Sequence, residues 1–292
     1  MSESVVPVPR AGAEAEEAAI TAAGRRRARN RRLLVNASRA LTLVVVIGGW
    51  QLFTAKGIVD PFFFGQPSAI WHQLVDWAKH GTAFGSLWLQ IWVTIKEALL
   101  GFAYGVGAGI VLGVLLGQVR FLSDVLGPYI KVMNAIPRIV LGSIFVVWLG
   151  LGTTSKVALV AVLVFFVVFF NAFQGVREVD RNLIANARVL GASRLQVNRH
   201  VIVPSALTWI IASLHVAFGF AIIGAIVGEF LGAQQGLGVV ISSAQGTLNA
   251  DGVFAAMLII AVVALTAEGL IGLLERRLLS WRPPSPTEAG TT

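Results

Sequence analysis

The sequence contains no cysteine, which excludes disulfide bonds and metal sites built from thiolates. Charged residues are scarce, at 13% of the 292 residues, whereas soluble domains contain about 25%. Signatures of common catalytic sites are missing too: there is no Gly-x4-Gly-Lys-Ser/Thr phosphate loop, no His-Glu-x2-His and no Gly-x-Ser-x-Gly. We therefore expect no enzyme, and no cofactor or metal bound by this chain itself.

The sequence is instead rich in hydrophobic residues, which form long apolar segments. Hydrophobic residues make up 56% of it, and its mean hydropathy is +0.77, which indicates a membrane protein. Several segments approach the length of about 20 residues that a bilayer requires. They are residues 40–55, 91–117, 122–149, 156–172, 206–231 and 252–274. The predicted fold class is an all-α membrane protein with six transmembrane helices, multi-pass in the cell (inner or plasma) membrane.

Basic residues predict the orientation. The net charge is +8, and the arginines fall at ends and loops that a six-span layout with cytoplasmic N- and C-termini puts inside, as the positive-inside rule requires. We expect a disordered basic cytoplasmic tail at 1–38, a six-helix transmembrane domain at 39–275 and a cytoplasmic tail at 276–292. An arginine-rich arm could instead bind RNA. Because these arginines lie beside a membrane segment, we expect the lipid bilayer as their partner and no nucleic acid.

Glycine recurs at every fourth position of the second apolar segment. The residues are Gly101, Gly105, Gly109, Gly113 and Gly117. On a helix this spacing makes a groove without side chains, which lets a second helix backbone approach closely. The pattern predicts a helix-packing seam. It leaves open whether the seam only packs tightly or also lets the helices slide.

The most polar internal stretch, residues 177–204, lies between two apolar segments and carries arginines between apolar residues at helical spacing. Gly191 interrupts the pattern and predicts a turn. Pro204 is expected to end the second helix, because proline lacks a donor and disfavours helix in the residue before it. On charge alone, the stretch could be an ordinary solvated loop.

The spacing within this stretch resembles the cytoplasmic signature Glu-Ala-Ala-x3-Gly-x9-Ile-x-Leu-Pro of ABC importer permeases. The corresponding residues here are Ala185, Asn186, Ala187, Gly191, Val201, Val203 and Pro204. Ala187, Gly191 and Pro204 match in identity, and the two valines are conservative replacements. Ala185 stands where the family has Glu, and Asn186 where it has Ala. The motifs at 228–230 and 236–238 also resemble the nitrate/sulfonate/bicarbonate branch.

The resemblance implies a type I importer permease whose 177–204 loop is the coupling helix that docks on an ATPase subunit. Arg188 and Arg194 would add charge pairing there. The implied partners are two ABC ATPase subunits that bind the ATP, an extracytoplasmic solute-binding protein and a second permease chain in a homodimer. The implied cargo is a small anion such as a sulfonate, taurine, nitrate or bicarbonate. A vitamin precursor, an ion-coupled secondary transporter and a membrane scaffold remain alternatives.

Four residues are candidates for the pathway or a gate: Asn134, Pro137, His215 and Glu229. A proline-broken helix at membrane depth is typical of a pathway-lining element, although proline kinks also occur without that role. We expect His215 to be a packing histidine rather than a proton relay. Because a charge is unfavourable in lipid, Glu229 is either a gate or structural partner, or an interfacial residue near a helix end.

Overall fold

The computed structural model describes residues 10–278, in which the regular elements are helices apart from one isolated bridge between Thr82 and Gly85. Five of these helices are long and apolar enough to cross a membrane, and there are up to six spans if one bent pair is a single span. The predicted all-helical class is confirmed, and six spans require counting the bent pair. The chain divides into two compact units, Met1–Ser68 and Ala69–Thr292; the expected domain boundaries at residues 38 and 276 stay predictions.

In the first unit, Arg10–Ala55 form one helix, α1, and Pro61–Phe64 form the short α2. The expectation of a disordered tail is therefore wrong for residues 10–38, while residues 1–9 lie outside the described residues. Composition is the physical reason. The segment that follows Pro9 is rich in Ala, Glu and Arg, which favour helix, and it contains no proline that would break one. Its second part, Arg27–Ala55, is a candidate span.

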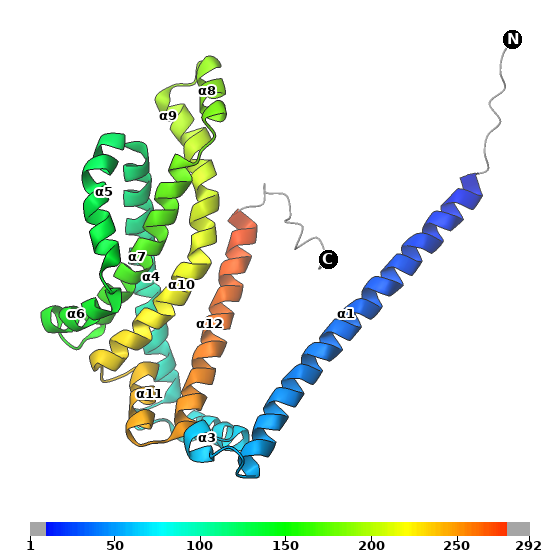
Figure 1. The fold of residues 1–292 in the computed structure, drawn as a ribbon, viewed down its shortest axis with the longest axis vertical. Helices are drawn as coiled ribbons and strands as arrows, with labels where there is room; N and C mark the ends of the chain where they lie inside the picture. The colour runs from blue at the N-terminus through cyan, green and yellow to red at the C-terminus, as the bar shows by residue number, and fades with distance from the viewer. Residues whose placement is uncertain (1–9, 279–292) are drawn as a thin grey trace. The chain divides into compact units, whose positions relative to one another are not determined.

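The remaining elements are α3 (Pro67–His80), α4 (Leu87–Gln118), α5 (Arg120–Ala135), η1 (Arg138–Val140), α6 (Leu141–Leu149), α7 (Thr153–Arg177), α8 (Arg181–Val189), α9 (Arg194–Val197), η2 (Asn198–Ile202), α10 (Val203–Gly232), α11 (Leu237–Gly246) and α12 (Ala250–Leu278). Helices α4, α7 and α10 lie side by side at the centre of the second unit (Figure 1). Their buried contact includes Ala98, Val164 and Ala221. Helix α12 continues to Leu278, so it includes the first residues of the expected cytoplasmic tail; residues 279–292 lie outside the described part of the chain.

The spaced glycines of α4 lie against α7. A Cβ atom added at Gly105 would lie 2.6 Å from the carbonyl oxygen of Ala161 and 2.7 Å from Cβ of Val164. Similar close approaches to α7 occur at the other glycines of the series, whereas a Cβ at Gly107 would have no such atom within 4 Å. The four-residue spacing therefore lets two helix backbones approach closely. Sliding along this seam stays a prediction.

Helix α5 and the η1–α6 segment form a bent pair with an angle of 78°. The break lies at Ile136 and Pro137, whose ψ angles of 130° and 101° are extended. The predicted break at Pro137 is confirmed, and its cause is the missing proline donor and the restriction on the preceding residue. The Arg138 guanidinium donates to the Asn134 side-chain oxygen across the bend.

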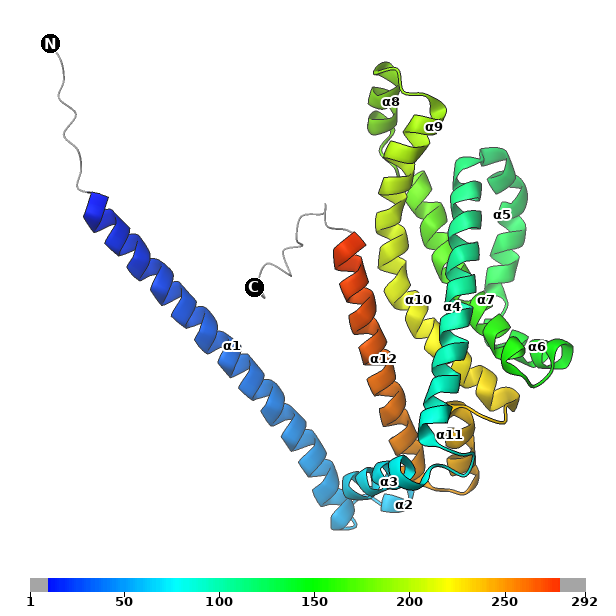
Figure 2. The same ribbon diagram turned by 180° about the vertical axis from the view of Figure 1, so that it is seen from behind.

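Elements α9, η2 and α10 form one continuous helix, Arg194–Gly232, so the expectation that Pro204 ends a helix is wrong. The physical reason is η2, a π turn in which the Val203 N–H donates to the Asn198 carbonyl, five residues earlier. Pro204 follows this turn in the first turn of α10, so the wider helix accommodates the proline there. Figures 1 and 2 show α8 and α9 at one end of the unit and α11 at the other.

Candidate functional site

Two structured features occupy opposite ends of the continuous helix. The first is the elbow, residues 180–197, which comprises α8, the turn after it and α9. The second is the clasp, formed by the side chains of Gln90, Thr94 and Glu229 with the backbone of residues 236–238. The elbow contains most of the loop residues predicted from the sequence. The clasp contains Glu229.

The first helix of the elbow begins and ends with defined caps. The Asp180 carboxylate accepts a hydrogen bond from the Asn182 N–H at 2.8 Å and so satisfies a free donor of the first turn of α8. At the other end, the Gly191 N–H donates a hydrogen bond to the Arg188 carbonyl at 2.9 Å, and the Ala192 N–H donates one to the Ala187 carbonyl at 3.0 Å. This is the Schellman pattern, whose turn residue adopts a left-handed conformation. Gly191 does so, with φ of 84°.

The second helix of the elbow has a capping box. The Ser193 hydroxyl accepts from the Gln196 N–H at 3.3 Å, and the Gln196 side chain accepts from the Ser193 N–H at 2.8 Å. Such reciprocal bonds satisfy two donors at a helix start. The turn between α8 and α9 is therefore fixed by backbone geometry and caps on both sides.

The structure brings several of the predicted loop residues together. A hollow between α8 and η2 is lined by Ala187, Gly191 and Val201, among others. Ala185, Asn186, Arg188 and Arg194 are exposed on the outside of the elbow. Val203 and Pro204 lie beyond η2, at the start of α10.

The elbow also exposes apolar side chains that the sequence did not single out as site residues. Val189 and Leu190 are 87% and 88% exposed, and Leu195 is 76% exposed. Leu190 and Leu195 fit the apolar spacing of the segment, which ordinarily marks a face turned toward the core. In the sequence, their place between arginines is the signal that could have identified them as a contact surface. The structure places them at a tip of the unit (Figure 1).

The elbow contacts the helices behind it through a buried side chain and a hydrogen bond. Val197 of α9 is buried, and the Gln118 side chain at the end of α4 donates to the Asn198 side-chain oxygen at 2.8 Å. From there the continuous helix Arg194–Gly232 has 39 residues, which corresponds to roughly 58 Å at 1.5 Å per residue. This single helix therefore connects the elbow to the opposite end of the unit.

At that opposite end, Glu229 is only 1% exposed. Its Oε1 accepts from the Thr94 hydroxyl at 2.7 Å, and its Oε2 accepts from the Gly238 N–H at 2.5 Å. Burial and two hydrogen-bond partners favour the interpretation of Glu229 as a gate or structural partner over that of a residue exposed to water.

The clasp satisfies the free backbone donors at the start of α11. The Gly236 N–H donates to the Gln90 side-chain oxygen at 2.7 Å, and the Leu237 N–H donates to the Thr94 hydroxyl oxygen at 2.8 Å. With the Gly238 N–H on Glu229, three successive donors are bonded to side chains of α4 and α10. A carboxylate is also favourable beside the positive end of a helix dipole.

The clasp explains the two glycines of the 236–238 motif. A Cβ at Gly236 would overlap the Glu229 carboxyl group, and one at Gly238 would lie 2.7 Å from Cβ of Glu229. Gly236 also has φ of 116°, which side chains rarely tolerate. Gln90 and Thr94 were missed by sequence reasoning, because nothing local to α4 indicates a partner 143 to 146 residues away.

The four pathway or gate candidates do not form one cluster. Asn134 and Pro137 lie at the bend between α5 and α6. His215 is half-buried on α10, fourteen residues before Glu229, which is about 21 Å along a helix. The structure therefore places these candidates at three separate positions.

Comparison with known proteins identifies a family. Residues 105–280 match the family described as "Binding-protein-dependent transport system inner membrane component". A putative aliphatic sulfonates transport permease protein, SsuC of Bacillus subtilis, is 32% identical over 82% of this chain and 85% of its own length. The riboflavin transport system permease protein RibX of Chloroflexus aurantiacus is 31% identical over 82% and 88% of the two chains. The taurine transport system permease protein TauC of Escherichia coli is 30% identical over 82% and 88%.

Solved structures share the fold. A chain of the MetNI methionine ABC transporter, in an inward-facing conformation, superposes with a TM-score of 0.57 at 20% identity, covering 66% of this chain and 96% of the other. A chain of an amino acid ABC transporter with histidines gives 0.55 at 23% identity, covering 64% and 92%. At these identities the likeness concerns the fold alone.

Proposed function

This chain belongs to the family of binding-protein-dependent transport system inner membrane components, and from that premise we propose that its elbow couples a membrane pathway to an ATPase. The chain is the permease component of an ABC importer and is not itself catalytic; ATP is hydrolysed by a separate subunit. The family also implies a binding protein that delivers the solute.

The exposed apolar tip of the elbow is the observation that carries the proposal. Leu190 and Val189 are nearly fully exposed in this chain, although burying one such side chain stabilises a complex by about 1.5–3 kcal/mol. The turn that presents them is fixed by the Schellman pattern at Gly191. A fixed apolar projection at the end of a long helix is suited to bind in a groove of the ATPase subunit.

Polar contacts would orient this docking. Arg188 and Arg194 are exposed on the elbow and are placed to pair with acidic residues of the ATPase. Ala185 stands where related permeases have Glu, so we expect one polar contact fewer, with the apolar contact of Leu190 unaffected. Exposed ion pairs contribute about 0–1 kcal/mol each, so the apolar tip dominates the affinity.

The mechanism follows from the continuous helix. ATP binding draws the two ATPase subunits together and displaces the elbow. The helix Arg194–Gly232 carries that displacement to the clasp, where the start of α11 is held against α4. The pathway then opens toward the side away from the ATPase, and hydrolysis with product release resets it. ATP shifts this equilibrium only by its differential interaction with the two states.

The assembly we propose is a homodimer of this chain with two ATPase subunits in the cytoplasm and one extracytoplasmic binding protein. It places the N-terminus, the C-terminus and the elbow on the cytoplasmic side. The arginine bias of the sequence supports this orientation.

We propose a small anion such as a sulfonate, taurine, nitrate or bicarbonate as the solute. The aliphatic sulfonate and taurine permeases among the relatives support this class. The riboflavin permease is nearly as similar, at 31% identity, and favours a vitamin precursor as the second candidate.

Reconstitution separates these outcomes. The chain, its cognate ATPase and its cognate binding protein are placed in proteoliposomes, and ATP hydrolysis is measured with the binding protein loaded with taurine, an alkanesulfonate or riboflavin. We expect the ATPase to copurify with the chain, and taurine or the alkanesulfonate to stimulate hydrolysis. Stimulation by riboflavin alone would select the second candidate. An ATPase that does not bind the chain would contradict both.

A further inference from the structure

A pocket lies at the end of the second unit that is opposite the elbow. Its lining comes from the first turns of α4, the turn between α6 and α7, the start of α7 and the residues between α10 and α11. Figures 1 and 2 show these parts at the end away from α8 and α9. The volume of the pocket is about 610 Å³, which is within the range of about 300–1,000 Å³ of small-molecule sites.

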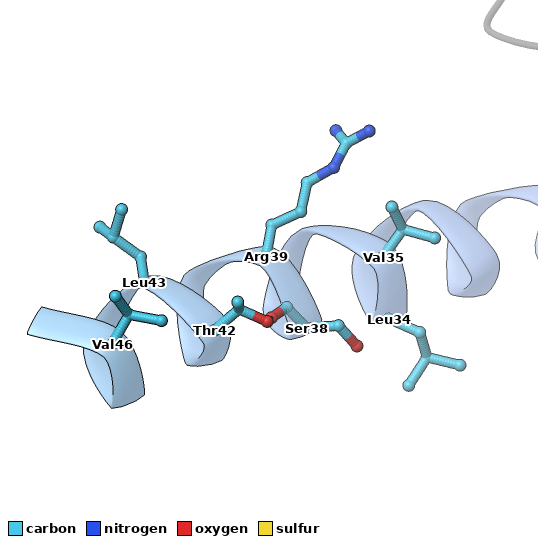
Figure 3. A pocket seen from close by; sticks show the side chains of 7 residues that line it. All are labelled: Leu34, Val35, Ser38, Arg39, Thr42, Leu43 and Val46. Carbon is cyan, nitrogen blue, oxygen red and sulfur yellow. The ribbon is translucent and has the colours of Figure 1, made fainter. Parts of the chain in front are cut away.

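The hollow on α1 is built differently. Figure 3 shows that the side chains that line it belong to one helix. All of them are exposed: Leu34, Val35, Ser38, Arg39, Thr42, Leu43 and Val46. One exposed helix face forms this hollow, whereas the pocket of the second unit has walls from several elements.

Glu97 is a buried acidic side chain that lines the pocket of the second unit. It is only 3% exposed, and the Thr153 side chain is hydrogen-bonded to its carboxyl group. Its Oε2 atom is nevertheless buried without a hydrogen-bond partner in the described part of the chain. Because a buried acceptor without a donor is unfavourable, Glu97 is suited to accept a hydrogen bond from a group that enters the pocket.

Two lysines line the same pocket and restrict what can bind there. Lys156 is 1% exposed, and its Nζ donates to the carbonyl oxygens of Leu151 and Gly152, to the second at 3.0 Å. These bonds hold Lys156 to the turn between α6 and α7. Lys96 is exposed on α4, so its ammonium group is accessible to a ligand.

Together these charges favour a ligand that carries charges of both signs. The two lysines repel a metal ion or another simple cation from Glu97, and the buried carboxylate repels a simple anion. An ammonium group can donate to the Glu97 Oε2 atom while an acid group of the same molecule pairs with Lys96. Charge-assisted hydrogen bonds of this kind are about twice as strong as neutral ones.

We propose that this pocket binds a zwitterionic solute, with its ammonium group on Glu97 and its acid group on Lys96. The inference rests on the proposed function for the direction of approach, since this end of the unit then faces the binding protein. It narrows the proposed solutes to those that carry an amine, such as taurine, and leaves out nitrate and bicarbonate.

Paramagnetic relaxation enhancement locates a weakly bound solute. Because the chain has no cysteine, a Thr154→Cys variant carries a single spin label at an exposed position next to Thr153. This chain and its ATPase, without the binding protein, are placed in nanodiscs of phosphatidylglycerol, a lipid without an amine. The relaxation of the methylene protons is compared for taurine and for ethanesulfonate, which lacks only the amino group. We expect an enhancement about tenfold larger for taurine.

Variants of the labelled chain assign this preference to the pocket. Glu97→Gln should reduce the taurine enhancement to that of ethanesulfonate, whereas Glu268→Gln, which changes an exposed acid of α12, should leave it unchanged. A spin label at Leu190→Cys, on the elbow, should give no enhancement with either solute. Equal enhancement for the two solutes at Thr154→Cys, which requires no change to Glu97, overturns the proposal. So does a taurine preference that survives Glu97→Gln.

Two further measurements separate this proposal from the proposed function and from a lipid ligand. In the same nanodiscs, ATP hydrolysis is measured with a binding protein loaded with an alkanesulfonate. Stimulated hydrolysis without the taurine preference overturns the pocket alone, and the preference without stimulated hydrolysis overturns the importer function alone. Phosphatidylethanolamine also carries an ammonium group, and its addition should leave the taurine enhancement unchanged. Displacement of taurine would assign the pocket to the lipid headgroup and overturn its assignment to a solute.

Discussion

A Gly191→Val chain is expected to enter the membrane normally and to lose about tenfold or more of the ATP hydrolysis that a loaded binding protein stimulates. Gly191 has φ of 84°, a conformation that costs an L residue about 1–2 kcal/mol, with a β-branched side chain among the worst cases. A Cβ there would have no atom within 4 Å, so the effect comes from the backbone and not from a clash. Each 1.36 kcal/mol of lost stabilisation corresponds to about tenfold in rate.

Gly191→Asn is the matched control, because asparagine tolerates the left-handed region, and it should keep most of the stimulated hydrolysis. Gly219→Ala is a second control, placed within α10. A Cβ at Gly219 also has no atom within 4 Å, so the stimulated hydrolysis should be unchanged. If Gly191→Val retained full stimulated turnover in proteoliposomes, the geometry of this turn would have no part in coupling.

A Glu229→Ala chain is expected to release the start of α11 from α4. The substitution removes the acceptors of the Thr94 hydroxyl and the Gly238 N–H, at 2.7 and 2.5 Å. Hydrogen bonds to charged groups contribute about 1.5–3 kcal/mol each, so the first-turn amides of α11 should exchange with solvent roughly 10- to 100-fold faster. Hydrogen–deuterium exchange of the 236–246 segment in nanodiscs measures this directly.

Glu268→Ala provides the control for this experiment, since Glu268 is an exposed acid on α12; exchange of α11 should be unchanged in that variant. Glu229→Gln keeps the size and one acceptor oxygen, so its exchange should lie between the other two. Unchanged α11 exchange in Glu229→Ala would show that the clasp does not hold this helix.

The parts of the fold that were predictable depend on local physics. The long apolar segments predict the membrane spans. Gly191 predicts the turn, because few other residues adopt its left-handed backbone conformation. The break at Pro137 follows from the missing donor of one residue. The glycine spacing on α4 predicts a seam, but its partner helix α7 becomes known only from the packing.

Other features could not be read locally. The clasp joins Gln90 and Thr94 of α4 to residues that follow them by 135 to 146 positions, and no local pattern encodes that pairing. Pro204 was expected to end a helix, because the π turn that accommodates it has no sequence signature. The low hydrophobicity of residues 10–38 is typical of a disordered tail, but the helix propensity of their Ala, Glu and Arg residues favours the helix that the structure shows.

Coupling requires the elbow to lie in the cytoplasm and to bind the ATPase, and the reactivity of a Leu190→Cys variant reports both. The chain has no other cysteine, and residue 190 is 88% exposed, so a membrane-impermeant maleimide reports its accessibility on this chain. We predict no labelling in intact cells, labelling in inside-out vesicles stripped of the ATPase, and protection when the ATPase is added back. Labelling from outside intact cells, or labelling that the ATPase does not change, would show that the elbow is not the cytoplasmic contact of the ATPase.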